Sequence, residues 1–493
     1  MTDADWARWG LALLPLGLSA ACIWSNYDNI FELTARSRAR RIPKGTRVSP
    51  IPFLGGLAGA AGIALSPLPE GWWWIAFLVD FPGTLGAGRA GDQDVPQASG
   101  DAPRADEARA AEAARIEAAQ RAEREHEERL RALQRAIEGC LLGTAVGDAL
   151  GLACEGLSPQ RRAKLFPDIA RYHLLPFGYG LCSDDTEHAV LLAQTLCTGG
   201  VYAEELEARE AAADFAWKLR FWVLGLPAGI GLATLRATMK LWLFIPPRWS
   251  GVNSAGNGPS MRSALLGVVY GGRPSRMRAM VRAITRITHT DPKAEQAAWT
   301  VAQAAYRSSA GGGRIAPAEL LADCRAALGG EAAEWLALVE RTVQSVERGE
   351  PTREFAAALG LERGVTGYSF HTVPVALHAC LSHPADYRSA VLAAIECGGD
   401  TDTVAAITGA IAGAGTGREG IPAPWLDKLA EWPRSVAWMQ VLARVLAKRA
   451  ADPDRPMALG PVPAAGAVKV LARNLLFIGV VLAHGLRRLL PPY

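Results

Sequence analysis

The sequence predicts an all-α protein, and three observations support this fold class. From about residue 136 to 448, segments rich in Ala and Leu show helical spacing of apolar residues between Gly and Pro breaks. Alternating runs of Val, Ile and Thr, which would indicate strands, do not occur in this stretch. Half of the 493 residues are apolar and a fifth are charged, which is typical of a folded chain with a large core.

Charge and cysteine content narrow the class of protein. The net charge is +3 with nearly balanced acids and bases, and no nucleic-acid motif occurs, so no nucleic-acid partner is expected. The eight cysteines include no CxxC pair and have no regular spacing. They therefore indicate small apolar residues of a reducing compartment.

Residues 1–86 are predicted to anchor the chain in a membrane. The run 9–27 is uncharged and, as a helix, would be about 28 Å long, close to the hydrocarbon core of a bilayer. A basic loop at 36–47 follows, predicted to be cytoplasmic, and then a second uncharged run at 49–69. Three interface-favouring tryptophans begin the segment 71–86, which either returns across the bilayer or lies along it. A hydrophobic hairpin packed on the main domain is the alternative for the whole region.

Residues 87–135 are predicted to form a linker in two parts. The stretch 87–100 is rich in Gly, Ala, Asp and Gln, which is typical of a flexible segment. Residues 102–138 are dense in Ala, Glu and Arg, with acid-to-base pairs such as Glu117 and Arg121 at helical spacing. They lack a sustained apolar seam, so the prediction is a solvated spacer helix of about 50 Å rather than a dimerising coiled coil.

The domain from 136 to 448 contains several clear helical patterns. In the segment 276–288 the apolar side chains share one face, with arginines opposite. The other clear examples are 292–307, 333–348, 385–396 and 434–449.

The tail from 449 to 493 is predicted to contain an amphipathic helix at a membrane surface. Within 466–490, Lys469, Arg473, His484 and Arg487 fall within about 60° of one another on a helical wheel. The wholly apolar run 475–483 is too short to cross a bilayer. The basic face is therefore expected to point towards anionic headgroups. A terminal helix docked on the domain is the alternative.

Two short acidic motifs each precede a run that is apolar nearly all round. The first acidic motif is Ser183-Asp184-Asp185-Thr186, and its apolar run extends to Leu196. The second is Gly398-Gly399-Asp400-Thr401-Asp402-Thr403, and its run is 404–412. Such runs are typical of buried helices, so both motifs are predicted at buried helix N-termini, where free amides favour negative charge.

Crowded carboxylates at a buried position require a counter-charge, which a hard divalent cation would supply. All the candidate ligands are oxygens, which suits Mg²⁺ or Mn²⁺ and argues against zinc or copper. For either motif alone, an Asp/Thr helix cap is an equally good interpretation. The presence of two such motifs favours one shared metal site.

At these motifs the sequence resembles the ADP-ribosylglycohydrolases. The resemblance also rests on Gly139-Cys140-Leu141-Leu142-Gly143-Thr144-Ala145-Val146-Gly147-Asp148-Ala149-Leu150-Gly151 with Glu155 after it, Gly256-Asn257-Gly258-Pro259-Ser260-Met261-Arg262, Thr288-His289-Thr290-Asp291-Pro292 and Gly367-Tyr368. These stretches follow the family's order over about residues 136–448. The resemblance implies a compact orthogonal helical fold with the metal site at helix ends.

The resemblance further implies a centre of two Mg²⁺ ions and the residues around it. The metal ligands would be Ser183, Asp184, Asp185, Asp400, Asp402 and Thr403, and the catalytic residues Glu155, Asp184, Asp185 and Asp402. Substrate would be bound by Gly256, Asn257, Gly258, Met261, His289 and Tyr368. The Gly-Asn-Gly loop would also let a diphosphate approach the backbone and the helix that follows. A plain turn, a capping histidine and a core aromatic are the alternatives for these features.

The expected activity is Mg²⁺-dependent hydrolysis of the glycosidic bond between ADP-ribose and a protein side chain or related acceptor. The alternatives are a membrane-tethered module that binds ADP-ribose without turnover, and a different binuclear phosphoesterase. The intact acidic motifs favour the glycohydrolase. Its partners would be an ADP-ribosylated protein or ADP-ribose conjugate and membrane lipid, with the catalytic domain in the cytoplasm.

Overall fold

The computed structural model describes residues 102–198, 204–451 and 461–490. The chain divides into two units, residues 1–102 and 103–493, and the helical domain lies in the second unit. The predicted membrane segments at 9–27, 49–69 and 71–86 and the flexible stretch 87–100 lie outside the described residues.

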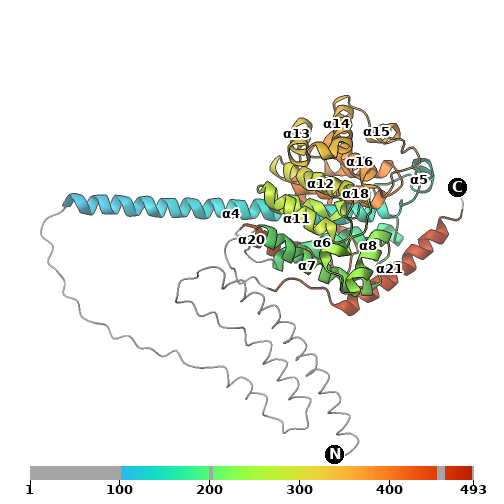
Figure 1. Ribbon diagram of the computed structural model, residues 1–493, viewed down its shortest axis with the longest axis horizontal. Helices are drawn as coiled ribbons and strands as arrows, with labels where there is room; N and C mark the ends of the chain where they lie inside the picture. The colour runs from blue at the N-terminus through green and yellow to red at the C-terminus, as the bar shows by residue number, and fades with distance from the viewer. Residues whose placement is uncertain (1–101, 199–203, 452–460, 491–493) are drawn as a thin grey trace, which may run out of the picture. The chain divides into compact units, whose positions relative to one another are not determined.

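The described residues are helical, without named strands, which confirms the predicted fold class (Figure 1). The α-helices are α4 (Ala102–Leu152), α5 (Pro159–Leu165), α6 (Asp184–Thr198), α7 (Glu204–Trp222), α8 (Leu232–Trp242), α9 (Pro247–Ser250), α10 (Ser260–Tyr270), α11 (Pro274–Arg286), α12 (Pro292–Ala310), α13 (Pro317–Leu328), α14 (Ala333–Glu347), α15 (Thr352–Ala358), α16 (Ser369–Ser382), α17 (Tyr387–Glu396), α18 (Thr401–Thr416), α19 (Ala423–Asp427), α20 (Val436–Ala451) and α21 (Ala467–Arg487). Short 3₁₀ turns are η2 (Pro176–Gly178), η3 (Val223–Gly225), η4 (Gly330–Ala332) and η5 (Arg418–Gly420).

The helices predicted from apolar spacing are present in the structure. The segments predicted at 276–288, 292–307, 333–348, 385–396 and 434–449 correspond to α11, α12, α14, α17 and α20. On α11 the residues Met277, Met280, Val281 and Ile284 are buried, as their shared face predicts.

Helix α18 lies inside the domain, where it packs against α12 and α16 (Figure 1). Every residue from Thr401 to Thr416 is buried. The sequence explains this position, because a helix without a polar face gains most from being surrounded by other helices. The second acidic motif is thereby held at a buried helix N-terminus.

A row of glycines on α4 allows its backbone to lie directly against α18. Gly139, Gly143, Gly147 and Gly151 recur every four residues and so share one face of the helix. A Cβ atom at any of them would collide with a carbonyl oxygen of α18, from Gly413 at one end to Thr401 at the other. At the far end Thr401 Oγ1 donates to the carbonyl of Gly151 at 2.8 Å, which brings the end of α4 against the second acidic motif.

Helix α4 also contains the predicted spacer. It runs without a break from Ala102 to Leu152, so the expected boundary between residues 135 and 136 lies inside one helix. Residues 112–129 are exposed, and burial begins where α4 enters the domain. The charged and the glycine-rich stretches are therefore the solvated and the buried parts of the same helix.

Helix α21 forms as predicted within 466–490, but its basic face does not point outward. Arg473 is buried and pairs with Glu431, with Nη2 2.7 Å from Oε2. The ring of His484 lies 3.1 Å from the carbonyl oxygen of Ala153. Only Lys469 and Arg487 of the four basic residues are exposed. The predicted orientation is therefore wrong, because the domain offers the helix carboxylate and carbonyl acceptors.

Candidate active site

The two acidic motifs meet at the N-termini of α6 and α18. Thr403 Oγ1 donates to Asp185 Oδ2 at 3.1 Å, and Ser183 Oγ donates to the same oxygen at 3.1 Å. Asp400 is the residue before α18, yet its side chain makes no capping bond to that helix. The alternative interpretation of this motif as a helix cap is therefore not what the structure shows.

A pocket of about 530 Å³ opens beside the two helix N-termini. Its walls include Thr403 and the predicted acidic residues Glu155, Asp184, Asp400 and Asp402. The predicted substrate residues Gly256, Asn257, Gly258, Met261 and His289 also line it. Ser183 and Asp185 are buried and are not among the lining residues.

Tyr368 does not line the pocket, although its neighbours Thr366 and Gly367 do. Its hydroxyl accepts a hydrogen bond from Lys293 Nζ at 3.0 Å, and its backbone pairs with that of Gly256. Tyr368 therefore supports the Gly-Asn-Gly loop in this structure and does not face the pocket interior.

Asn257 connects the Gly-Asn-Gly loop to the second acidic motif. Its Nδ2 donates to Asp400 Oδ2 at 2.6 Å and to Thr372 Oγ1 at 2.9 Å. Its backbone N–H donates to the carbonyl of Gly367 at 2.9 Å. The loop and one carboxylate are thus held in fixed relation across the pocket.

His289 lies against the same loop in its neutral form. Burial, together with the charge of Arg262, lowers the pKa of His289 to about 3. Arg262 Nη2 donates to Thr288 Oγ1 at 2.7 Å, and that hydroxyl lies 2.8 Å from His289 Nδ1. If the hydroxyl donates onward to Nδ1, Nε2 carries the proton and can donate to a ligand.

Asp148 contacts the first acidic motif, although it was not among the predicted site residues. It is fully buried on α4, and its carboxylate accepts the N–H groups of Ser183 and Thr186 at 2.9 and 3.2 Å. It also accepts the Thr186 hydroxyl at 2.6 Å. Asp148 therefore caps α6 from another helix, which leaves the carboxylates of Asp184 and Asp185 available for other partners.

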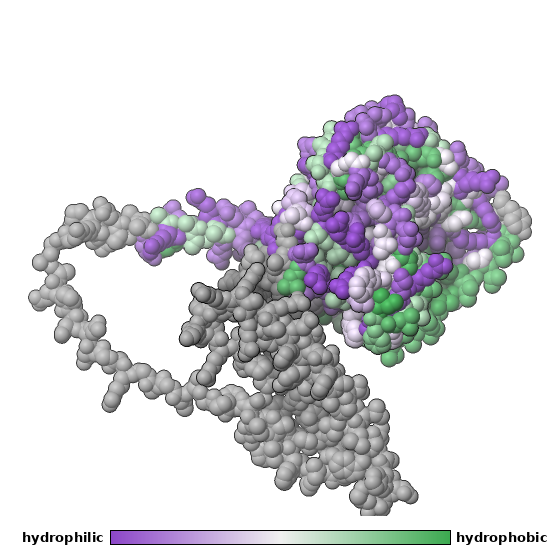
Figure 2. All heavy atoms as spheres, in the orientation of Figure 1, coloured by the Kyte–Doolittle hydropathy of each residue, from purple (hydrophilic) through white to green (hydrophobic). Residues whose placement is uncertain are grey.

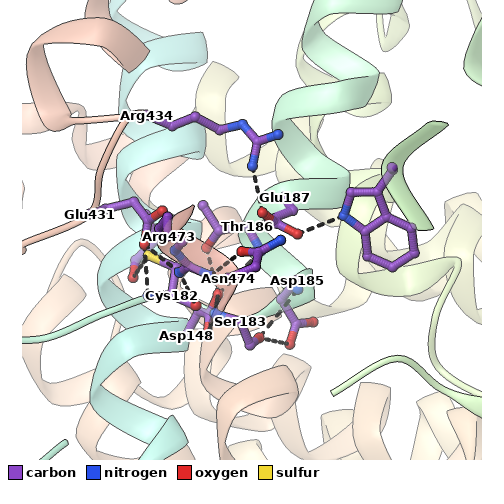
Figure 3. A network of polar contacts seen from close by, with 12 residues as sticks. Asp148, Cys182, Ser183, Asp185, Thr186, Glu187, Glu431, Arg434, Arg473 and Asn474 are labelled. Carbon is purple, nitrogen blue, oxygen red and sulfur yellow. Dashed lines mark hydrogen bonds and ion pairs between the residues drawn. The ribbon is translucent and has the colours of Figure 1, made fainter. Parts of the chain in front are cut away.

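Polar contacts from α21 support the segment before α6 (Figure 3). Glu431 accepts the N–H of Cys182 at 3.1 Å, and Arg473 donates both to Glu431 and to the carbonyl of Cys182. On the same helix α6, Glu187 accepts from Trp222 Nε1 at 2.6 Å and pairs with Arg434. Buried, charge-assisted hydrogen bonds thus hold the first acidic motif and its helix in position.

Burial makes the ionised form of the carboxylates at and around the two acidic motifs unfavourable. It raises the pKa of Asp184, Asp185 and Asp402 well above the usual range, and the neighbouring carboxylates raise each of them further. Burial followed by the charge of Asp400 raises the pKa of Glu155, although its side chain is open to the pocket. Burial also raises the pKa of Asp148, to about 6.

Two of the carboxylates in the acidic motifs have oxygen atoms without a hydrogen-bond partner. Oδ1 of Asp185 and Oδ1 of Asp402 are buried without a hydrogen-bond partner. Unpaired buried carboxylate oxygens are costly, and a hard cation would satisfy them. In the described part of the chain, no three His, Cys, Asp or Glu side chains lie in an arrangement that could hold a metal ion without rearrangement. The donor chemistry fits a divalent cation, with hydroxyl groups of Ser183 and Thr403 adjoining the carboxylates.

The helical domain brings carboxylates at two buried helix N-termini beside one pocket, and hydrolysis of a glycosyl bond requires such carboxyl groups. The family model of ADP-ribosylglycohydrolases matches residues 129–456. The chain therefore belongs to the ADP-ribosylglycohydrolase family, as its motifs indicate.

Curated relatives resemble the chain over most of their own length. An uncharacterized protein of Archaeoglobus fulgidus is 29% identical over 60% of this chain and 92% of the relative. The ADP-ribosyl-[dinitrogen reductase] glycohydrolase of Rhodospirillum rubrum is 28% identical over 59% and 89%. The ADP-ribosylarginine hydrolase Tri1 of Pseudomonas putida is 29% identical over 66% and 82%. A solved ADP-ribosylglycohydrolase-related protein complex is 27% identical, covers 65% of this chain and 99% of its own, and has a TM-score of 0.47.

Proposed function

We propose that this chain removes ADP-ribose from a protein side chain or a related acceptor in a reaction that depends on Mg²⁺. The observation that carries the proposal is the meeting of two acidic helix N-termini beside one pocket that Glu155 also lines. Hydrolysis of a glycosidic bond requires carboxyl groups beside the bond and stabilisation of positive charge on the sugar. The pocket supplies carboxyl groups on the side where α6 and α18 begin.

Two Mg²⁺ ions would be held by Ser183, Asp184, Asp185, Asp400, Asp402 and Thr403. A bound divalent cation supplies an acidified water and orients the hydroxyls of a sugar. The buried oxygens of Asp185 and Asp402 that lack hydrogen-bond partners support this assignment over a purely structural role. Mn²⁺ is the alternative ion, because it accepts the same oxygen ligands.

The remaining pocket residues bind and orient the substrate. Gly256 and Gly258 lie against the His289 ring, so a side chain at either would occupy the space beside it. The backbone there can approach a diphosphate closely, with His289 Nε2 as a donor. Glu155, whose pKa is raised by burial and by the charge of Asp400, would exchange a proton at the scissile bond.

The test of the proposed function is release of ADP-ribose from modified protein with and without Mg²⁺. Substrates modified at Arg, at Ser and at an O-acetyl acceptor should be compared, with Asp402→Ala as the inactive control. Release that requires Mg²⁺ and the intact acidic motifs is expected. Tight ADP-ribose binding with no release from any acceptor would instead support the non-catalytic binding module, and phosphate release would support a phosphoesterase.

We also propose that residues 1–86 anchor this activity at a membrane, with the catalytic domain in the cytoplasm. The uncharged runs and the basic loop at 36–47 support the anchor, and the buried unpaired cysteines suit a reducing compartment. Single cysteines at Ser37 and Ser99 should both resist a membrane-impermeant thiol reagent in intact cells. Labelling at Ser99 alone would place the domain outside.

A further inference from the structure

Helix α21 docks on the domain through its polar face. Arg473 and Asn474 are buried, and Asn474 Nδ2 donates to the carbonyl of Gly225 at 2.8 Å while Arg473 pairs with Glu431. Further along, Arg488 Nη2 donates to the carbonyl of Ala153 at 2.9 Å. These polar contacts fix the rotation of the helix about its axis.

The opposite face of α21 is apolar and exposed. Val468, Leu475, Leu482 and Leu486 are 81%, 54%, 63% and 67% exposed. At 100° per residue these four lie within about 40° of one another and point away from Arg473. A terminal helix that only covers a soluble domain turns its apolar stripe inward, so this helix has the reverse arrangement. It is also the one helix in the described ranges with the length and composition to cross a bilayer.

Exposed apolar side chains continue from α21 onto neighbouring elements. Helix α21 contacts η3, where Leu224 is exposed. The exposed residues then follow the chain through α8 to α9, namely Leu226, Leu232, Leu243, Phe244 and Trp249. Figure 2 shows hydrophobic residues gathered along α21 and at the adjoining edge of the domain. We call the exposed apolar residues of α21, η3, α8, α9 and their connections the outer apolar face.

The two segments that build the outer apolar face contain no acidic residue. From Phe215 to Thr290 there are eleven Lys and Arg residues and no Asp or Glu, and residues 461–493 are also free of Asp and Glu. Exposed basic residues within these segments include Arg236, Arg248, Lys469 and Arg487. Apolar side chains mixed with Lys, Arg and exposed aromatics are the composition of a surface that enters the headgroup region of an anionic membrane.

We infer that the outer apolar face lies on an anionic lipid bilayer, with the mouth of the pocket at its edge. Leu232 belongs to this face and also lines the pocket. A second copy of the chain is a poorer occupant, because a two-fold contact would bring basic groups together with no carboxylate from either side. An orientation in which α21 crosses the bilayer is also disfavoured, because Arg473 would have to leave Glu431 and enter the hydrocarbon core.

This inference narrows the substrate class of the proposed hydrolase, and that step rests on the proposed function. A pocket held at the headgroups reaches ADP-ribose on an acceptor within or directly beside the bilayer. Preferred substrates are therefore ADP-ribosylated membrane proteins or membrane-bound conjugates, rather than freely diffusing ones.

The location of the face is tested by fluorescence quenching in the full chain. Seven described cysteines are buried, so Cys22→Ser leaves a background for single reactive cysteines. Probes attached after Leu482→Cys and Phe244→Cys should be quenched by brominated lipid in phosphatidylserine-containing vesicles and shielded from iodide. A probe after Ala326→Cys, exposed on α13, should behave in the opposite way. Probes on the face that iodide reaches, or that neither quencher reaches because protein covers them, would overturn the inference.

The substrate step is tested with the same ADP-ribosylated peptide in solution and tethered to vesicles. Leu482→Glu with Leu486→Glu should lower kcat/KM on the tethered peptide at least tenfold and leave the soluble activity unchanged. The matched control is Ala322→Glu with Ala326→Glu, an exposed pair at the same spacing on α13. An equal fall in kcat/KM on both peptides, or no fall on either, would refute the preference for membrane-bound substrates. Absence of activity on both peptides in the unmodified chain would refute the proposed function, while the quenching result would still stand by itself.

Discussion

The hydroxyl of Thr403 donates a hydrogen bond to Oδ2 of Asp185, 218 positions away in the sequence. This bond joins the first turns of two buried helices and leaves Oδ1 of Asp185 without a partner. A site built only for stability would pair both oxygens of a buried carboxylate, because an unpaired one weakens the fold. The acidic motifs therefore combine a precise arrangement with a local electrostatic cost, which a cation would offset.

The first prediction concerns this cost. Asp402→Asn should stabilise the metal-free protein by about 1–2 kcal/mol, because it removes a charge that burial and nearby carboxylates disfavour. It should also abolish turnover and most of the increase in Tm that Mg²⁺ causes in the unmodified protein. Thermal unfolding with EDTA and with Mg²⁺ measures both effects. An Asp402→Asn protein that is less stable than the unmodified protein in EDTA, or still stabilised by Mg²⁺, would contradict the shared metal centre.

The second prediction concerns Asp148, which positions the first acidic motif without lining the pocket. Asp148→Ala leaves the N–H groups of Ser183 and Thr186 without their acceptor and should cost about 2–4 kcal/mol of stability. Asp148→Asn keeps an acceptor oxygen and should lose less. If the residue acts by positioning, Asp148→Asn should weaken Mg²⁺ affinity and lower kcat while the KM for substrate changes little. A change in stability alone would make Asp148 a structural residue only.

Local sequence patterns predicted the elements of the fold better than the contacts between them. The run 404–412 has no polar face, so its burial as α18 follows from the sequence alone. The role of Asp148 does not, because Ser183 and Thr186 lie 35 and 38 positions away and leave no local signal near it. Likewise, a helical wheel shows that Arg473 shares a face with other basic residues. The wheel cannot show that Glu431 of the domain lies where it pairs with Arg473.

The third prediction tests the close contact between α4 and α18. Gly147→Ala should destabilise the domain by about 3 kcal/mol or more, because the added Cβ would collide with the Ala405 carbonyl. Gly479→Ala is the matched control within α21, where a Cβ meets no atom within 4 Å. It should stabilise by about 0.5–1 kcal/mol through helix propensity. Urea unfolding of both variants gives the comparison, and similar values for the two would show that the helices are not in contact there.

The fourth prediction concerns His378, a buried residue of α16 away from the pocket. Burial lowers its pKa to about 4, and its ring contacts the hydroxyls of Ser345 and Thr352. The folded state therefore disfavours the protonated ring. Its contribution is complete above pH 6.5 and is lost as the pH falls from 6.5 towards 4. The stability difference between the unmodified protein and His378→Asn should shrink by about 2–3 kcal/mol over that range.

Urea unfolding at pH 7, 5.5 and 4.5 measures this difference, in which the titration of all other groups cancels. His126→Asn, at an exposed position of α4, serves as the control for the substitution itself. A pH-independent difference for His378→Asn would mean that the ring is protonated equally in the folded and unfolded states.

The fifth prediction separates catalysis from metal binding at Glu155. Its side chain lines the pocket beside Asp400, and its pKa is raised by burial and by the charge of Asp400, which favours a role in proton transfer. Glu155→Gln keeps the size and polarity of the side chain but cannot exchange a proton, so kcat should fall about 10²–10⁴-fold. The KM and the increase in Tm with Mg²⁺ should remain near those of the unmodified protein. Weakened Mg²⁺ binding with a normal rate at saturating metal would instead make Glu155 a ligand. A normal rate with normal Mg²⁺ binding would exclude it from both roles, leaving its carboxyl group to shape the pocket wall next to Asp400.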